Sequence, residues 1–186
     1  HVGHEHARKN RMAVLRTFAE LQKDAAPPVQ SLVFVGSALT QEMLALIAEH
    51  PGLAANVHVL RDVSHDDLRA LYCGATALLF PSLQEGFGWP IIEAQACGCP
   101  VFTSDLAPMN DIGSDAAVYV DPRNPAAIAN AIREAVPRLA AMREGGLANA
   151  AHYSAANMTA RYVEQYRAAV AARQAAPEGV GAATNR

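Results

Sequence analysis

Two glutamates eight positions apart, Glu85 and Glu93, are the side chains of this sequence best suited to chemistry on a bound ligand. A Gly-Phe-Gly turn at 86–88 and a proline at position 90 lie between them, and an apolar run at 77–80 precedes them. A strand that breaks into a glycine loop and then a helix start is a common way to hold an anionic group. Carboxylates accept hydrogen bonds from hydroxyl groups. Together these features suggest a nucleotide sugar as the ligand.

The main chain between the two glutamates supplies hydrogen-bond donors. Gly86 and Gly88 permit unusual φ and ψ and a close approach of the backbone. The amides of Trp89 and Ile91 stand at the predicted helix start, where N–H groups can point at an anion. One turn into the helix, Glu93 could reach two neighbouring hydroxyls of a ribose. In the alternative interpretation Glu85 caps a turn and Glu93 is a surface residue of the helix. That interpretation does not explain the glycines between them.

A second candidate site lies at the beginning of the chain. Gly3 ends a predicted strand, and Arg8, Lys9 and Asn10 open the helix that follows. Two cations beside the amides of a helix start would hold a diphosphate. Taken alone, an Arg-Lys pair at a helix start is most often a solvated face, but its position behind a strand-end glycine favours a ligand.

Two weaker patterns stand near these. The loop at 61–64, which contains Arg61 and Val63, could read the edge of a base with its backbone, and an ordinary turn explains it equally well. The histidines at positions 1, 4 and 6 alternate, but no acidic or cysteine partner stands at ligand spacing, so no metal site is predicted.

Strand and helix patterns alternate along the whole chain. Strands are predicted near Val2 and at 31–35, 57–60, 77–80, 100–103 and 117–120. Helices are predicted at 9–23, 40–50, 64–73, 90–97, 124–142 and 149–172. Ser64 followed by Asp67 resembles a capping box at the start of one of them.

This alternation predicts an α/β fold: a Rossmann-like, three-layer αβα sandwich around a mainly parallel sheet of about six strands. Ligands of such sheets bind beyond the carboxyl ends of the strands. The opening loop and the Glu85 loop both lie at that edge, so they can face one crevice.

The composition fits one folded domain and excludes several classes of protein. The chain has 186 residues, 51% of them hydrophobic, which is enough for a sizeable core. A net charge of -3 gives no electrostatic reason to expect nucleic acid as the main partner. The odd count of 3 cysteines argues against a disulfide framework and fits a reducing compartment.

These motifs resemble the C-terminal, donor-binding domain of a GT-B glycosyltransferase of the large retaining family 4. The most specific match is the segment 80–104, which is similar to the Glu-X7-Glu segment of that family and the strand after it. The segments 2–10, 32–36, 68–72 and 115–122 support it, and the opening stretch is most similar to mannosyltransferase-like members.

The resemblance implies a role for each matching position. Glu85 lies beside the transferred sugar, and the amides of Phe87 and Gly88 approach its hydroxyls. Arg8 and Lys9 neutralise the diphosphate and its leaving charge, so with Glu85 they form the catalytic set. The donor-binding set is Gly3, Arg8, Lys9, Arg61, Val63, Glu85, Gly86, Phe87, Gly88, Trp89, Ile91 and Glu93.

The resemblance also implies the activity and its setting. The expected reaction transfers a hexose, with mannose from GDP-mannose as first choice, to a saccharide or lipid acceptor with retention of configuration, and needs no metal or other cofactor. Residues 1–172 are expected to form the donor domain and 173–186 a disordered tail. The acceptor domain is expected to precede this chain, which alone would bind donor and transfer nothing. A cytoplasmic location is expected, and peripheral association with the inner membrane face through the other half stays open.

Three alternatives remain beside this interpretation. The chain could be a nucleotide-sugar-binding module without turnover, or another GT-B enzyme such as a sugar-nucleotide epimerase. A phosphorylase would need a lysine for pyridoxal phosphate, and neither Lys9 nor Lys23 stands in such a context. The residues do not favour an NAD-binding Rossmann domain, because no Gly-X-Gly-X-X-Gly follows a strand.

Overall fold

A computed structural model describes residues 1–175 of the chain. These divide into two units: His1–Ala151, which holds all the described strands, and a helical part that begins at His152. Each unit is described by itself.

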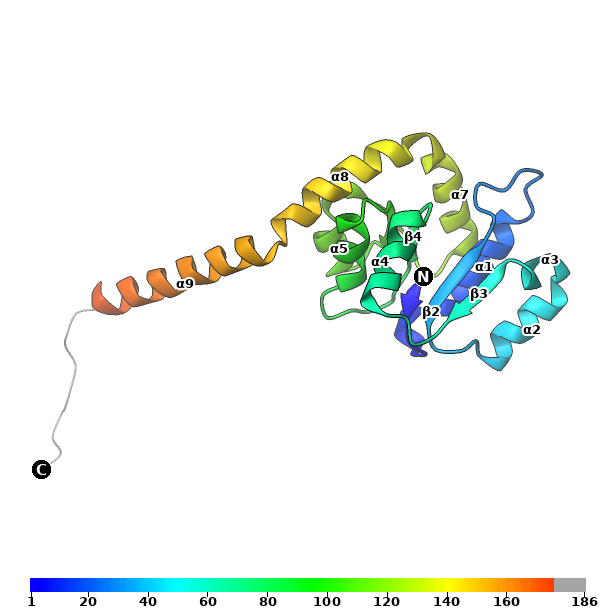
Figure 1. The fold of residues 1–186 in the computed structure, drawn as a ribbon, viewed down its shortest axis with the longest axis horizontal. Helices are drawn as coiled ribbons and strands as arrows, with labels where there is room; N and C mark the ends of the chain where they lie inside the picture. The colour runs from blue at the N-terminus through cyan, green and yellow to red at the C-terminus, as the bar shows by residue number, and fades with distance from the viewer. Residues whose placement is uncertain (176–186) are drawn as a thin grey trace, which may run out of the picture. The chain divides into compact units, whose positions relative to one another are not determined.

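The first unit contains two groups of three parallel strands (Figure 1). One has the order β1-β2-β3 and the other β4-β5-β6. Their bounds are β1 (Val2–Gly3), β2 (Leu32–Gly36), β3 (Val57–Leu60), β4 (Leu78–Phe80), β5 (Val101–Ser104) and β6 (Ala117–Val120). The parallel α/β architecture predicted from the sequence is therefore confirmed.

The six strands are hydrogen-bonded as two three-strand ladders and not as one continuous ladder. β1 has two residues and pairs only with Val35 and Gly36 of the longer β2. Between β1 and β4 the contact comes from a side chain: Nδ1 of His1 lies 3.0 Å from the carbonyl oxygen of Leu79. A strand this short cannot supply main-chain partners along the edge of β4.

Helices connect these strands and follow them in the chain. Their bounds are η1 (Ala7–Lys9), α1 (Arg11–Leu21), α2 (Gln41–Glu49), α3 (Pro51–Ala54), α4 (His65–Gly74), α5 (Trp89–Ala96), α6 (Met109–Gly113), η2 (Ser114–Ala116), α7 (Pro125–Ala135), η3 (Val136–Arg138), α8 (Leu139–His152) and α9 (Ala155–Ala175).

The helix starts follow local capping chemistry. Ser64 accepts the amide of Asp67 at 3.1 Å, as the predicted capping box requires. The predicted helix at 124–142 is wrong as a single element, because the chain passes through η3 at Pro137 and α8 begins afterwards. A proline inside a helix removes one backbone donor and crowds the preceding turn. The predicted helix at 149–172 is also divided, and Ser154 caps α9 through the amide of Asn157 at 3.3 Å.

Apolar side chains of α1, β2 and α2 form one core cluster. Val14, Leu15 and Phe18 of α1 are nearly fully buried and pack with Phe34 of β2 and Met43 of α2. Phe80, Ile91, Phe102 and Met109 have at most 1% exposure in the other half of the unit. The apolar residues at i, i+1 and i+4 of α1 explain why this helix faces the sheet.

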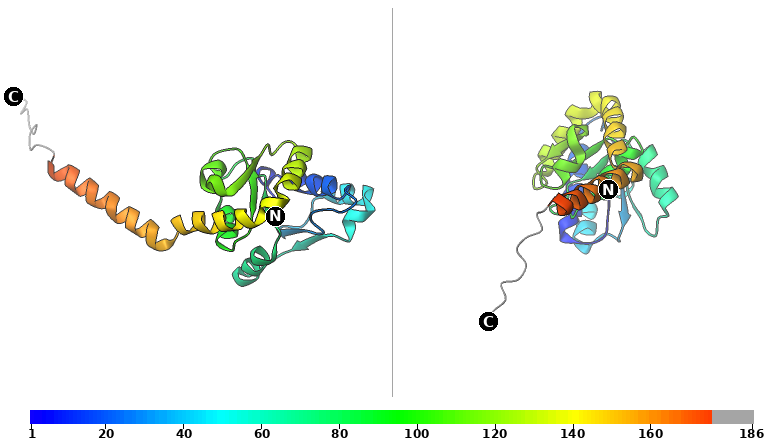
Figure 2. Two further views of the ribbon diagram at one scale, coloured as in Figure 1. Left: turned by 90° about the horizontal axis from the view of Figure 1, so that it is seen from above. Right: turned by 90° about the vertical axis from the view of Figure 1, so that its left-hand side faces the viewer.

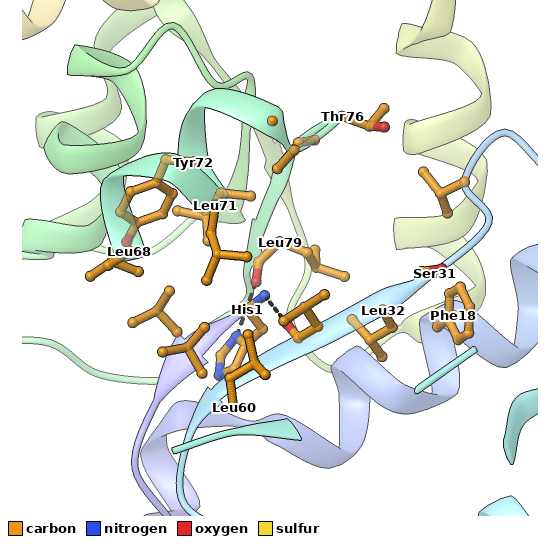
Figure 3. Close-up of a pocket in the computed structure, with 18 of the residues that line it drawn as sticks. His1, Phe18, Ser31, Leu32, Leu60, Leu68, Leu71, Tyr72, Thr76 and Leu79 are labelled. Carbon is orange, nitrogen blue, oxygen red and sulfur yellow. Dashed lines mark hydrogen bonds between the residues drawn. The ribbon is translucent and has the colours of Figure 1, made fainter. Parts of the chain in front are cut away.

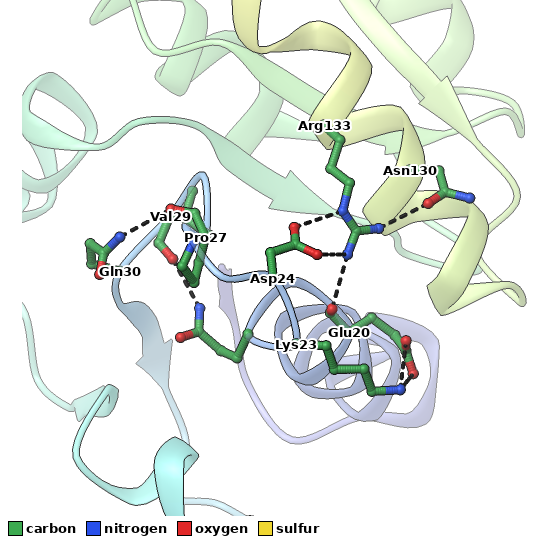
Figure 4. A network of polar contacts seen from close by, with 9 residues as sticks. Glu20, Lys23, Asp24, Pro27, Val29, Gln30, Asn130 and Arg133 are labelled. Atoms are coloured by element: carbon green, nitrogen blue, oxygen red, sulfur yellow. Dashed lines mark hydrogen bonds and ion pairs between the residues drawn. The ribbon is translucent and has the colours of Figure 1, made fainter.

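A polar network fixes the end of α1 against α7 (Figure 4). Nε and Nη2 of Arg133 donate to the two carboxylate oxygens of Asp24 at 2.8 and 2.9 Å. The same Nη2 donates to the carbonyl of Glu20 at 3.0 Å, and Nη1 donates to Asn130 at 2.9 Å. These hydrogen bonds of the Arg133 guanidinium hold the beginning of the loop between α1 and β2.

The second unit contains α9, one continuous helix (Figure 2). It ends at Ala175, three residues into the predicted tail, and the remainder of that tail, 176–186, lies outside the described residues. Within the described residues, no helix combines the length and the apolarity that crossing a bilayer requires.

Candidate functional site

Lys9 and Glu85 form an ion pair between loops 76 residues apart in sequence. Nζ of Lys9 lies 2.7 Å from Oε1 of Glu85, and the two side chains are only 14% and 8% exposed. The ammonium also lies 5.0 Å from the ring centroid of Phe80 at the end of β4. The two loops that the sequence placed at one edge therefore meet, and the pair brings together two members of the predicted catalytic set.

Glycines make room for this pair. A Cβ atom on Gly3 would stand 3.2 Å from two carbons of the Lys9 side chain. Gly36, at the end of β2, has a φ of +128°, and a Cβ there would stand 2.5 Å from the carbonyl oxygen of Gly3. The ends of β1 and β2 approach this closely only because Gly36 lacks a side chain.

Asn10 holds the beginning of α1 against the other half of the unit. Its side-chain amide donates to the carbonyls of Pro81 at 2.9 Å and Pro122 at 2.7 Å. Its φ of +52° places it in the left-handed region, which asparagine tolerates better than most residues. The bend between η1 and α1 occurs here, so Asn10 fixes the direction in which Lys9 points.

Arg8 stands beside Lys9 with its side chain exposed. Its main chain is fixed: the carbonyl accepts the amide of Leu83 at 2.7 Å, and the amide donates to Nδ1 of His6 at 3.3 Å. The guanidinium is thus carried on a rigid turn next to the Glu85 loop and can meet an anion from solvent.

The Gly-Phe-Gly turn leads directly into α5. Gly88 is the N-cap, with a φ of +99° that an L side chain rarely adopts. Gly86 has open space around it. The amide of Ile91 already donates to the carbonyl of Gly88 at 2.9 Å, so the turn itself uses one of the two predicted donors. Trp89 therefore carries the better placed of the two amides.

Two aromatic rings lie at the same helix start. The ring centroids of Phe87 and Trp89 are 4.6 Å apart with planes inclined by 40°. Trp89 is 53% exposed and Phe87 is half-buried. The position of the pair gives the Glu85 loop an apolar surface beside its charges.

Glu93 has a partner that the sequence reasoning missed. The hydroxyl of Tyr72, on α4, donates to Oε2 of Glu93 at 3.3 Å. Burial, and then the neighbouring charge of Glu93, raise the pKa of Tyr72 above its usual range, so its hydroxyl stays protonated as a donor. Glu93 is exposed otherwise, and no contact joins it to Lys9 or Glu85 within residues 1–175.

The loop between β3 and α4 lies elsewhere. Arg61 and Val63 line a large apolar cavity together with Tyr72, and Lys9 and Glu85 do not line it. Asp62 between them has a φ of +54°. The loop thus shares a cavity with Tyr72, the partner of Glu93, and not with the ion pair.

A cation pair, an acid held against one of the cations and a helix start can bind an anionic ligand that also carries hydroxyls. The arrangement lies at the carboxyl ends of β1 and β4, between the two strand groups. Ligands of open parallel sheets bind at this kind of position.

Solved structures share this fold. A glycosyltransferase from Rickettsia africae ESF-5 aligns with a TM-score of 0.77 at 19% identity, over 89% of this chain and 45% of that one. Sucrose-phosphate synthase from Thermosynechococcus elongatus aligns with a TM-score of 0.74 at 24% identity, over 92% and 45%. The C-terminal domain of a glycosyl transferase group 1 family protein from Francisella tularensis aligns with a TM-score of 0.68 at 18% identity, over 80% and 81%.

The sequence matches are consistent with the structural ones. Residues 1–138 match the family of glycosyl transferases group 1, and the chain belongs to that family. It is 27% identical to O-antigen chain mannosyltransferase B of Escherichia coli, over 90% of this chain and 45% of that protein. It is 32% identical to D-inositol 3-phosphate glycosyltransferase of Mycobacterium avium (strain 104), over 91% and 41%. The chain therefore spans about half the length of the curated relatives it matches.

Proposed function

We propose that this chain is the donor-binding half of a retaining family 4 glycosyltransferase that transfers a hexose, with mannose as first choice, from a nucleoside-diphosphate sugar. The observation that carries the proposal is the buried contact between Lys9 and Glu85, 2.7 Å apart across the two strand groups. The contact puts a cation and an acid in one crevice beside the start of α5. Membership of the glycosyl transferases group 1 family supports a transferase.

In this proposal Arg8 and Lys9 meet the diphosphate. As the bond between sugar and diphosphate breaks, negative charge grows on the leaving phosphate oxygen, and two cations on a fixed turn stabilise it without reorganising. The amide of Trp89 adds a main-chain donor at the start of α5. These groups meet the charge without a metal ion.

Glu85 and Glu93 take the hydroxyl-bearing parts of the donor. Donor binding moves Lys9 from Glu85 toward the diphosphate, which frees the carboxylate of Glu85 for the sugar. Glu93, oriented by Tyr72, accepts hydrogen bonds from the ribose. The acceptor is a saccharide or a lipid-linked group bound by another part of the whole protein, and the reaction takes place in the cytoplasm.

Trp89 offers a direct measurement, because it is the single tryptophan of the chain and half of its surface is exposed. Titration with GDP-mannose, GDP, UDP-glucose and NAD should change its fluorescence for the guanosine ligands at the lowest concentrations. Glu93→Ala should weaken binding about tenfold or more, because a carboxylate that accepts two hydroxyls contributes about 1.5–3 kcal/mol.

Glu49→Ala is the matched control, because Glu49 is an exposed glutamate at the end of α2 and should leave the titration unchanged. Equal affinity of all four ligands, or of Glu93→Ala and the parent chain for GDP, would contradict the proposed donor site. Transfer itself is tested with the whole protein by the mass and anomeric configuration of the product. The chain alone should bind donor and transfer no sugar.

A further inference from the structure

Two of the 3 cysteines meet between α4 and α5. Cys73 is exposed near the end of α4, and Cys97 is the half-buried C-cap of α5. The thiol of Cys97 donates a hydrogen bond to the sulfur of Cys73. Both residues are free thiols, so both sulfur atoms are available for reaction with each other.

The spacing of residues along both helices supports this contact. On α4, Arg69, Tyr72 and Cys73 stand at positions i, i+3 and i+4, which share one face of a helix. On α5, Glu93 and Cys97 stand one turn apart, and the amide of Cys97 donates to the carbonyl of Glu93 at 3.3 Å. The hydroxyl of Tyr72 donates to Glu93, also at 3.3 Å. The thiol contact and this hydrogen bond are therefore neighbouring contacts of one helix pair.

The Cys73 thiol is separate from the large apolar cavity that α4 also borders (Figure 3). Leu68, Leu71 and Tyr72 of α4 line that cavity, whereas Cys73 does not line it and is exposed. A small polar oxidant such as hydrogen peroxide can therefore reach the sulfur of Cys73 directly from solvent.

The surroundings of the two thiols differ. Burial raises the pKa of the Cys97 thiol, and the neighbouring Cys73 thiol raises it further. The positive charge of Arg69 acts in the opposite direction and stabilises the Cys97 sulfur when its proton leaves. An accessible thiol beside a second, more protected thiol is the arrangement that redox-sensitive cysteine pairs have.

We propose that Cys73 and Cys97 are a modification site at which hydrogen peroxide forms a reversible disulfide between α4 and α5. The sulfur of Cys73 attacks one peroxide oxygen, the O–O bond breaks, and a sulfenic acid on Cys73 and one water result. The sulfur of Cys97 then displaces the hydroxyl group from Cys73 as the S–S bond forms. The proton of Cys97 leaves with that hydroxyl as a second water. The two thiols lose two electrons, which reduce the peroxide.

The disulfide restrains the two helices beside Glu93. Its Cys73 end directly follows Tyr72 on α4, and its Cys97 end stands one turn beyond Glu93 on α5. An S–S bond of about 2.05 Å is shorter than any contact between two separate thiols, so α4 and α5 adjust around it. The oxidised and reduced chains therefore differ at the helix pair that carries the hydrogen bond from Tyr72 to Glu93.

Cys99 provides an internal control. It is 1% exposed, and its thiol donates to the carbonyl oxygen of Pro100 at 3.6 Å. Burial raises its pKa to about 11, which keeps the thiol protonated. Although Cys99 follows Cys97 closely in sequence, the native fold should leave it unmodified.

The test treats the full chain with hydrogen peroxide, alkylates the remaining thiols with N-ethylmaleimide and identifies linked peptides by mass spectrometry. The native chain should form one disulfide, between Cys73 and Cys97, which dithiothreitol reverses. Cys99 should be alkylated only after unfolding. Cys99→Ser should form the same disulfide, whereas Cys97→Ser should keep a sulfenic acid on Cys73 that dimedone traps.

Equilibration with reduced and oxidised glutathione measures whether the fold favours the disulfide. The equilibrium constant for its formation should be at least about tenfold larger in the native chain than in urea. By thermodynamic linkage, the same factor should raise the Tm of the oxidised chain by roughly 3–5 °C. Equal equilibrium constants in the two states would overturn the proposal. So would Cys73-to-Cys73 dimers as the main product, or a sulfinic acid on Cys73 without any bond to Cys97.

Discussion

The hydroxyl of Tyr72 on α4 donates a hydrogen bond of 3.3 Å to Oε2 of Glu93 on α5. The two residues are 21 positions apart in sequence. Tyr72 is 5% exposed, whereas Glu93 faces solvent. A buried, fixed donor therefore restrains an exposed acid on α5. Such a restraint lowers the entropy that Glu93 loses when it binds a ligand.

Tyr72→Phe should weaken binding of GDP by about 2- to 10-fold, because it removes one hydrogen bond and keeps the ring in place. The effect should be smaller than that of Glu93→Ala. In the double variant the Tyr72 change should add nothing further, since its effect acts through Glu93. Fluorescence titration of Trp89 measures all four affinities, and full additivity would exclude the positioning role.

Lys9→Met should destabilise the fold by about 3 kcal/mol, because it leaves the carboxylate of Glu85 buried without its cation. Lys9→Met combined with Glu85→Gln should recover most of that loss. Lys23→Met is the control: its pair with Glu20 is an i,i+3 contact with Lys23 62% exposed, and such pairs contribute at most about 1 kcal/mol. Urea unfolding measures the series, and equal losses for the two lysines would contradict the buried pair.

Gly36→Ala should cost about 3 kcal/mol or more, since φ is +128° and the new Cβ would stand 2.5 Å from the carbonyl oxygen of Gly3. Gly52→Ala, where nothing lies within 4 Å and the residue belongs to α3, should be neutral or stabilise by up to about 1 kcal/mol. Thermal unfolding of both variants checks this. A Gly36→Ala chain as stable as the parent would mean that β1 and β2 end further apart.

Asp24→Asn should lower Tm near neutral pH and lose this effect in acid. The hydrogen bonds from Arg133 hold the pKa of Asp24 below its ordinary value of 3.8. A carboxyl whose folded pKa is depressed stabilises the fold above the unfolded pKa and stops doing so as pH falls through the folded one. The Tm difference between the two chains should therefore be constant near pH 7 and shrink below about pH 4. A difference that stays constant into strong acid would contradict the ion pair.

Local chemistry in the sequence predicted the elements well. Ser64 caps α4 as expected, and Pro90 lies in the first turn of α5. Pro137 is a local signal for the division of the predicted helix at 124–142. The prediction of one helix followed the helical pattern on both sides of Pro137 and disregarded the proline. Short-range signals of this kind act within a few residues, so periodicity and turn chemistry can capture them.

The contacts between residues of the site could not be predicted from local sequence signals. Tyr72 meets Glu93 from another helix, and Asn10 reaches Pro81 and Pro122 over 71 and 112 positions. Sequence spacing does not encode such distances, because the packing of whole layers sets them. The meeting of Lys9 with Glu85 was predictable only because parallel strands align their carboxyl ends.

Asn10 ties the ends of two strands to the beginning of a helix. One amide group binds main-chain oxygens that follow β4 and β6 while its own residue begins α1. We therefore expect that the loops around it can be lengthened or exchanged without moving these strand ends or the start of α1. A designer who wants to change what this site binds should vary the tips of those loops and leave this asparagine alone.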